Sequence, residues 1–235
     1  MDDNIIKCAV LETYQLHCIK SFPIDCIKVL EAYGMKVKTY SSQKPKKYEQ
    51  CMTYSKDAFT LKQTVYYNDT QIPGRIKFSL AHEIGHIALK HTTPRTPLHE
   101  KEADSFASHF LAPRMAIHYT QSKNLNDVIN IFKLSEKAAG NAFNDYRRWR
   151  RDISIYGMSP LDKQMYEYFF NPEAQKFVWS LERCDFCYTN NAYNGSKLCD
   201  SCKIYEIRKN INIKKADYLE HDLDIARSGW LYGNL

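Results

Sequence analysis

The segment His82-Glu83-Ile84-Gly85-His86 constrains the fold of this 235-residue chain more than any other. Four apolar residues around it recur at spacings of four, four and three: Ile76, Leu80, Ile84 and Ile87. This spacing predicts a helix that begins at Pro73-Gly74 and runs to about residue 90. Residues four apart on a helix differ by about 40 degrees in direction, so the two imidazoles project together and can bind one zinc ion. The fold must therefore bring further ligands to this helix face.

Glu83 lies beside the histidine pair rather than in line with it. From there its carboxylate can reach a water at the metal instead of the metal itself, and take a proton as that water attacks a carbonyl. We therefore predict Glu83 as a general base for hydrolysis, with His82 and His86 as zinc ligands. The alternative is a chance match on a solvated helix face, which the helical context and the acidic residues downstream disfavour.

A second helix is predicted directly downstream. Thr96 provides an N-cap and Pro97 a favourable first helical residue, while Pro113 ends the segment. Its apolar stripe consists of Ala103, Phe106, Ala107, Phe110 and Leu111. A catalytic zinc needs three protein ligands and one open position, so this helix is the expected source of the third ligand.

Four side chains of this helix are candidates for that ligand: His99, Glu100, Glu102 and Asp104. Glu100 lies about 50 degrees from the centre of the apolar stripe and Glu102 about 110 degrees, so Glu100 faces inward more directly. Asp104, four residues on, shares that face and can accept a proton from a ligating histidine. We prefer Glu100 as the ligand and Asp104 as its supporting carboxylate. Glu102 is the fallback, and His99, in the first turn, ranks last.

The remaining pattern predicts an α+β fold, with helices around a short, mostly antiparallel sheet. A helix and a strand are expected within residues 22–40, divided at Gly34, and then a loop over 41–50. Residues 58–61 and 64–67 have the pattern of a hairpin. Further on, apolar residues at helical spacing in 125–132 and 135–149 predict a helix-turn-helix-like pair. The Arg147–Arg151 run resembles phosphate-binding surfaces, but we favour a solvated helix end with Trp149 in the core.

Four of the eight cysteines form two close pairs near the C-terminus: Cys184, Cys187, Cys199 and Cys202. This spacing is typical of a zinc ribbon, in which four thiolates fill the coordination sphere and the metal is structural. We therefore predict a metallopeptidase domain over 1–122, a helix-turn-helix-like subdomain over 123–152, a linking helix over 153–180, and the ribbon with its tail over 181–235. Residues 217–235 contain Trp230 and Tyr232 and are expected to pack back on the body.

Composition limits the classes of partner. Lys and Arg number 33 against 27 Asp and Glu, a mild basic excess that makes DNA contact conceivable but only weakly supported. No apolar run approaches the roughly 20 residues that span a bilayer, and the N-terminus is acidic where a secretory signal is basic. We expect a cytoplasmic protein without membrane contact, whose cysteines are thiols or metal ligands rather than disulfides.

The two motifs in register resemble the ImmA/IrrE family of zinc metallopeptidases. The resemblance rests on His82–His86, on the run Glu100-Lys101-Glu102-Ala103-Asp104-Ser105-Phe106-Ala107, and on Leu111-Ala112-Pro113, and it covers about residues 20–150. It implies a compact gluzincin-type fold with one catalytic zinc held by His82, His86 and Glu100, with Glu83 as base. Members of this family typically cleave a DNA-binding repressor.

We therefore expect an intracellular zinc endopeptidase whose protein substrate is a transcriptional repressor of a mobile element or stress response, with one catalytic and one structural zinc. The repressor assignment comes from the resemblance alone. The alternative is a regulatory adaptor, in which both zinc sites are architectural and the helix pair and ribbon bind DNA or a repressor without cutting it. The oxyanion donor is left open between His118 and Tyr119, just past the second helix.

Overall fold

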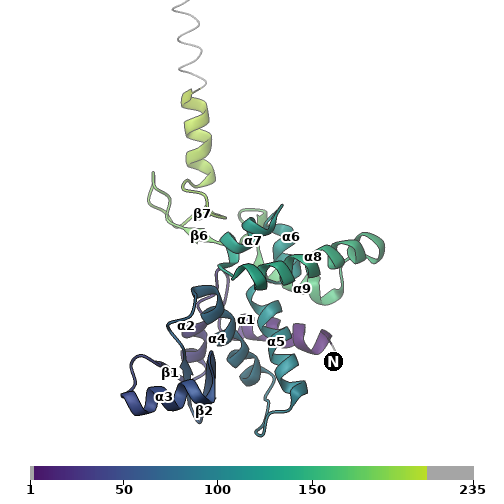
Figure 1. Ribbon diagram of the computed structural model, residues 1–235. Helices are drawn as coiled ribbons and strands as arrows, with labels where there is room; N and C mark the ends of the chain where they lie inside the picture. The colour runs from purple at the N-terminus through teal and green to yellow at the C-terminus, as the bar shows by residue number, and fades with distance from the viewer. Residues whose placement is uncertain (1–2, 211–235) are drawn as a thin grey trace, which may run out of the picture. The chain divides into compact units, whose positions relative to one another are not determined.

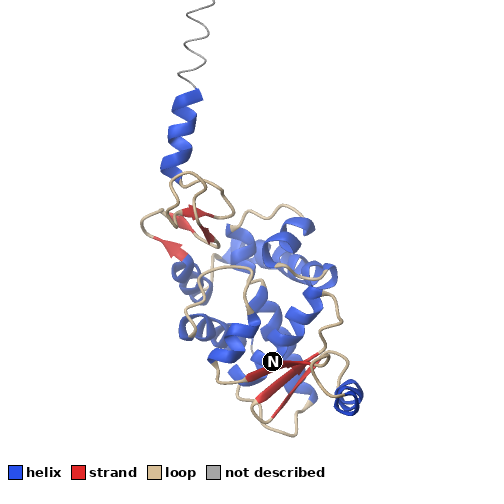
Figure 2. Cartoon of the chain, turned by 90° about the vertical axis from the view of Figure 1, so that its left-hand side faces the viewer, coloured by secondary structure: helices blue, strands red, loops and turns tan. Residues whose placement is uncertain are grey.

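The computed structural model describes residues 3–210 and divides the chain into two compact units at Trp179/Ser180. Among the described residues, the first unit contains nine helices, a three-stranded sheet and one short strand pair, and the second contains a two-stranded pair and the cysteine cluster. Figure 1 shows the elements in chain order, and Figure 2 shows how largely helical the first unit is. The predicted α+β class is confirmed.

The main sheet has the strand order β1-β3-β2, with β1 at Lys36–Thr39, β2 at Ala58–Leu61 and β3 at Thr64–Tyr67. β2 and β3 form the predicted antiparallel hairpin, whereas β1 runs parallel to β3 with Val37 opposite Val65. The parallel pair requires a crossover, and the chain makes it through helix α3 (Pro45–Tyr54). The short pairs β4–β5 (Phe170–Asn171 with Lys176–Phe177) and β6–β7 (Leu181–Glu182 with Ala192–Tyr193) are antiparallel.

Two helices lie where the pattern did not predict them. The predicted loop over 41–50 is wrong in its second half, because α3 begins at Pro45. This helix buries only Cys51, with Tyr48 and Met52 partly packed, so it has too few apolar residues to show a stripe. Helix α1 (Asp3–Leu16) packs along the helix that carries Glu100, and its Tyr14 hydroxyl donates to the carbonyl of Phe110.

The centre of the first unit is the packing of α4 (Pro73–Ala88) against α5 (Pro97–Leu111), with α2 (Cys26–Ala32) beside α4. Gly85 lets the two helices approach closely: a Cβ there would lie 3.1 Å from Cδ1 of Phe106 and 3.2 Å from the carbonyl oxygen of Ala103. Thr96 caps α5 and Pro97 occupies its first turn, as predicted. The motif residues thus lie on two helices in direct contact.

The remaining helices of this unit are α6 (Arg114–Tyr119), α7 (Leu125–Phe132), α8 (Glu136–Tyr156) and α9 (Pro160–Phe169). The helices α7 and α8 form the predicted pair, joined through Lys133 in the left-handed region at φ 53°. Val128, Phe132 and Ala139 belong to the same hydrophobic core as α4 and α5. Trp149 is buried, as expected, and donates from its indole to Asp162 at 3.0 Å. The expected helix end at the arginine run is wrong, because α8 continues to Tyr156.

The second unit, from Ser180, consists of β6, β7, the four paired cysteines and a helical segment over 200–210. The expected packing of Trp230 and Tyr232 lies outside the described residues. The finer domain boundaries at 122, 152 and 180 stay predictions. Within residues 3–210, no helix combines the length and the apolar character needed to cross a membrane.

Two glycines provide a matched test of the packing. A Cβ on Gly74 would lie 2.3 Å from the backbone nitrogen of Ser135, which cannot move aside without shifting the α7–α8 turn, whereas nothing lies within 4 Å of a Cβ on Gly140 in α8. We expect Gly74→Ala to lower the free energy of unfolding by about 1–3 kcal/mol. Gly140→Ala should raise it by about 0.5–1 kcal/mol through helix propensity.

Denaturant unfolding of both variants measures the difference. Equal effects of the two substitutions would show that the turn before α8 does not pack on α4 as described.

Candidate active site

Helices α4 and α5 bring together three side chains that could hold a metal ion: His82, His86 and Glu100. The Nε2 atoms of His82 and His86 lie 3.0 Å apart. Glu100 faces both of them, with Oε2 3.2 Å from Nε2 of His82 and Oε1 3.5 Å from Nε2 of His86. The carboxylate is half exposed, whereas His86 is buried.

This donor set fits zinc by its chemistry and by its spacing. Two imidazoles and a carboxylate are a common protein ligand set for a catalytic zinc, and one position is left for water or substrate. Ligand atoms about 2.0 Å from a tetrahedral zinc lie about 3.3 Å from one another. The separations of 3.0, 3.2 and 3.5 Å bracket that value. The three side chains are therefore arranged to hold zinc with little rearrangement.

A second set of contacts holds each imidazole at its other nitrogen. Nδ1 of His82 lies 2.8 Å from Oδ1 of Asp104, and Nδ1 of His86 lies 2.9 Å from Nδ1 of His91. Nε2 of His91 in turn lies 3.2 Å from Oε2 of Glu102. Both Nε2 atoms are thereby turned toward Glu100. Asp104 occupies the supporting position that the sequence predicts, and Glu102 contacts His91 rather than the histidine pair.

The contact between His86 and His91 is not among the contacts predicted from the sequence. The α4 helix ends at Ala88 with Leu89 as its C-cap, and Lys90 takes a left-handed conformation at φ 55°. This reversal lets the backbone N–H of His91 donate to the carbonyl of His86 at 2.9 Å, so the two rings meet. A histidine five residues after the motif, just past a helix end, is the signal that could have predicted it.

The electrostatics of the two histidines differ. Burial, with the positive charge of Arg95 and the neighbouring imidazoles, lowers the pKa of His86 to about 3, so His86 is neutral and available as a ligand. Burial also acts to lower the pKa of His82, but the hydrogen bond and charge of Asp104 outweigh it and raise that pKa. Asp104 thus favours a proton on the side of His82 that faces away from Glu100.

Glu83 is held in place by residues from two other segments. Oγ1 of Thr60, in β2, donates to Oε2 of Glu83 at 2.6 Å, and Nη2 of Arg95 donates to the same oxygen at 2.9 Å. The Glu83 side chain is only 3% exposed. A buried carboxylate needs such partners, because leaving one unpaired is very costly. Neither Thr60 nor Arg95 belongs to a motif, and no signal in the sequence links them to Glu83.

His82, Glu83, Arg95 and Glu100 all line one cleft of about 560 Å³, which is bounded on the opposite side by residues of β2 and the end of α3. The two oxyanion candidates lie elsewhere. Tyr119 packs on Tyr166 and Phe177, and His118 contacts Tyr146 and Trp149; neither lines this cleft. Tyr54 and Arg95 line the cleft, so their side chains are better candidates for the hydrogen-bond donor to an oxyanion.

The four paired cysteines form the second candidate metal site. Their Sγ atoms all lie within 4.8 Å of one another, with Cys187 and Cys199 3.6 Å apart. Sulfur ligands about 2.3 Å from a tetrahedral zinc lie about 3.8 Å apart, so this cluster also has suitable spacing. Backbone N–H groups of Cys187 and Cys199 lower the pKa of the Cys184 thiol to about 6, which favours the thiolate that a metal requires. All eight cysteines lie in the described range and are free thiols.

Comparison with known proteins supports the family suggested by the motifs. Residues 30–144 match the model of the IrrE N-terminal-like domain, Peptidase_M78. A search of curated proteins returned no match. The matched segment begins in α2 and ends in α8, so it contains the sheet, the His82–His86 helix and the Glu100 helix. Residues 30–144 therefore form a domain of the ImmA/IrrE peptidase family, as the two motifs in register predict.

Proposed function

We propose that the chain is a zinc-dependent endopeptidase that cleaves a regulatory protein, and that this protein is a DNA-binding transcriptional repressor. One observation supports the peptidase activity above all: two Nε2 atoms and a carboxylate converge at metal-ligand spacing beside the buried, positioned carboxylate of Glu83. The repressor as substrate follows from the family resemblance, and a cytoplasmic setting is proposed from the acidic N-terminus and the lack of long apolar runs.

In this proposal His82, His86 and Glu100 hold the zinc, which when bound would polarise the scissile carbonyl and lower the pKa of water. Glu83 takes the proton of the attacking water and delivers it to the leaving amine. Thr60 and Arg95 keep the carboxylate oriented toward the cleft. Asp104 and His91 fix the two imidazoles, so that little reorganisation is needed before the reaction.

A second, structural zinc is proposed for Cys184, Cys187, Cys199 and Cys202. Four thiolates leave no position for a substrate, and the segment that they join has only one small apolar cluster of its own. Metal binding would therefore supply much of the folding free energy of this unit.

Metal content tests the two sites separately. We expect two zinc ions for each chain, and one ion fewer in His86→Ala and in Cys187→Ser, because each substitution removes a ligand from a different site. The control His118→Ala should keep both ions, since His118 lies outside both clusters. Elemental analysis after dialysis measures the ratio. Full zinc content in His86→Ala would contradict the assignment of the first site.

The contact between His91 and His86 predicts an effect on metal affinity. We expect His91→Ala to weaken zinc binding at the His82/His86/Glu100 site by about 10–100-fold, because the His86 ring loses the partner that orients it. Competition with a chelator, monitored in a variant whose cysteine site has been removed by Cys187→Ser, measures the affinity. An unchanged affinity would show that the contact does not orient His86.

Proteolysis itself is tested by mass spectrometry of candidate repressors, taken from genes near this one and incubated with zinc-loaded protein. We expect the wild type to generate one new pair of termini, and Glu83→Gln to slow cleavage by at least about 10²-fold through loss of the base. The control Glu49→Gln alters an exposed carboxylate on α3 and should cleave like the wild type.

Equal cleavage by Glu83→Gln would contradict the role of Glu83. If the wild type cuts no repressor but cuts members of a peptide library, the repressor assignment is wrong. If it cuts neither, the peptidase proposal itself is wrong.

A further inference from the structure

A large groove lies beside the catalytic cleft, along α8. It has a volume of about 1190 Å³ and lies between α5 and α8. Phe78 and Asp104 line both this groove and the cleft that contains His82 and Glu83, so the two hollows share a wall. A polypeptide bound in the cleft therefore passes next to the groove.

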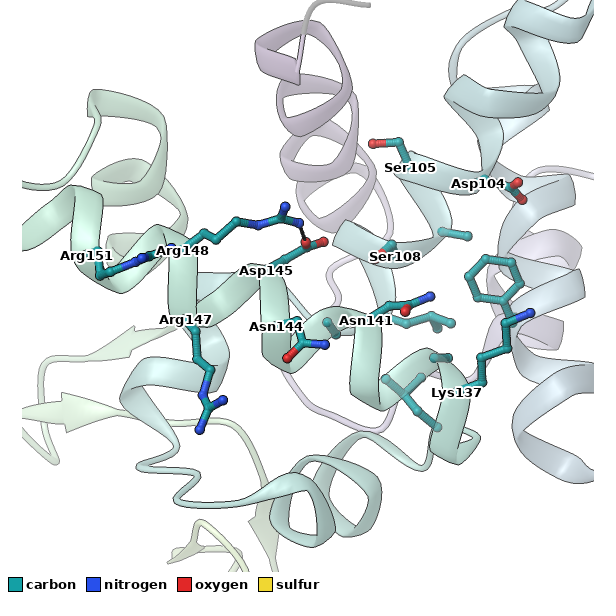
Figure 3. A pocket seen from close by; sticks show the side chains of 16 residues that line it. Asp104, Ser105, Ser108, Lys137, Asn141, Asn144, Asp145, Arg147, Arg148 and Arg151 are labelled. Atoms are coloured by element: carbon teal, nitrogen blue, oxygen red, sulfur yellow. Dashed lines mark hydrogen bonds and ion pairs between the residues drawn. The ribbon is translucent and has the colours of Figure 1, made fainter.

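The α8 wall of the groove contains a polar stripe beside the apolar residues Ala138 and Ala142. The residues of this stripe recur at alternating spacings of four and three: Lys137, Asn141, Asn144, Arg148 and Arg151. Figure 3 shows these side chains along one helix, with Asp104, Ser105 and Ser108 on the other, and Lys137 nearer to Asp104 than Arg151 is. Fourteen residues separate Lys137 from Arg151, which at 1.5 Å per residue is about 21 Å, the length of about six residues of extended chain.

In the part of the chain that the structure describes, the groove is left with unpaired positive side chains, because both of its carboxylates already have partners. Both carboxylates on its walls are already engaged: Asp104 by His82, and Asp145 by Arg114 at 2.6 Å and by Arg148. Burial acts to raise the pKa of Asp145, but the bonds from Arg148 and Arg114 outweigh it and keep that carboxyl ionised. Lys137 and Arg151 are exposed, and no ion pair involves either of them within residues 3–210.

On the basis of the proposed endopeptidase function, we propose that this groove binds an acidic, extended segment of the protein substrate, adjacent to the segment that enters the catalytic cleft. Cationic side chains at the two ends would attract carboxylates of that segment. Asn141, Asn144 and Ser105 provide donors and acceptors for its backbone.

Duplex DNA is a poorer fit for this helix face. A helix that reads DNA enters the major groove, which requires a face that projects from the protein. Here the basic residues of α8 line a groove opposite α5 rather than a projecting surface.

The test uses the full-length, zinc-loaded Glu83→Gln protein, so that binding is measured without cleavage. Two fluorescent peptides of about twelve residues, long enough to exceed the groove, differ only in that glutamates in one are glutamines in the other. Anisotropy at low salt should show at least about tenfold tighter binding of the glutamate peptide, with the advantage shrinking as salt rises. A short duplex DNA of arbitrary sequence is the third probe.

Charge reversal locates the binding site. Lys137→Glu/Arg151→Glu should remove the preference for the glutamate peptide. The control Arg150→Glu/Lys163→Glu makes the same change in net charge on residues that do not line the groove, and should retain that preference. Circular dichroism and thermal unfolding verify that both double variants are folded.

Equal binding of the two peptides, absence of binding, or equal loss in both double variants would overturn the proposal. Duplex DNA that binds more tightly than the glutamate peptide and is released by the groove variant would also overturn it, in favour of nucleic acid. Because peptide binding does not need Glu83, failure of the peptidase proposal would appear separately, as substrate that is bound but not cut.

Discussion

The close contact between α4 and α5 at Gly85 is the constraint on which the site depends. The histidines lie on one helix and Glu100 on the other, so the distance between the helix axes determines whether three donors can share one ion. A side chain at position 85 would press on Phe106 and on the backbone of Ala103. The cost of glycine within a helix, about 1 kcal/mol relative to alanine, is therefore offset by the packing that assembles the metal-binding residues.

Hydrogen bonds orient the side chains that helix packing brings together. Each histidine of the motif offers one nitrogen to the site and has the other tied to a neighbour, Asp104 in one case and His91 in the other. Glu83 is likewise fixed by Thr60 from the sheet and by Arg95 from the loop between the helices. The sheet edge thus contributes to the chemistry although none of its residues is a candidate ligand. Side chains held in this way need little reorganisation, which is the main electrostatic advantage of an enzyme site.

The sequence was sufficient to predict those elements that depend on residues close together along the chain. The His82–His86 helix, the cap at Thr96 and the hairpin around β2 and β3 follow from periodicity and capping rules. Helix α3 lacked a stripe because it covers only a small cluster around Cys51. His91 reaches the site through a chain reversal just past the end of α4, a signal that helical periodicity does not contain. Thr60 and Arg95 reach Glu83 through tertiary contacts, and no spacing in the sequence encodes those. Glu100 and Asp104 could be ranked in advance because both lie on one regular helix.

The central claim is that the contact between α4 and α5 creates a three-ligand zinc site with one open position. Diffraction from crystals of the zinc-loaded protein, with anomalous data collected on both sides of the zinc edge, tests it most directly. The account predicts a peak within about 2.0–2.2 Å of Nε2 of His82, Nε2 of His86 and a carboxylate oxygen of Glu100, with no fourth protein ligand. A peak ligated by His91 or Glu102, or density only at the four cysteines, would contradict it.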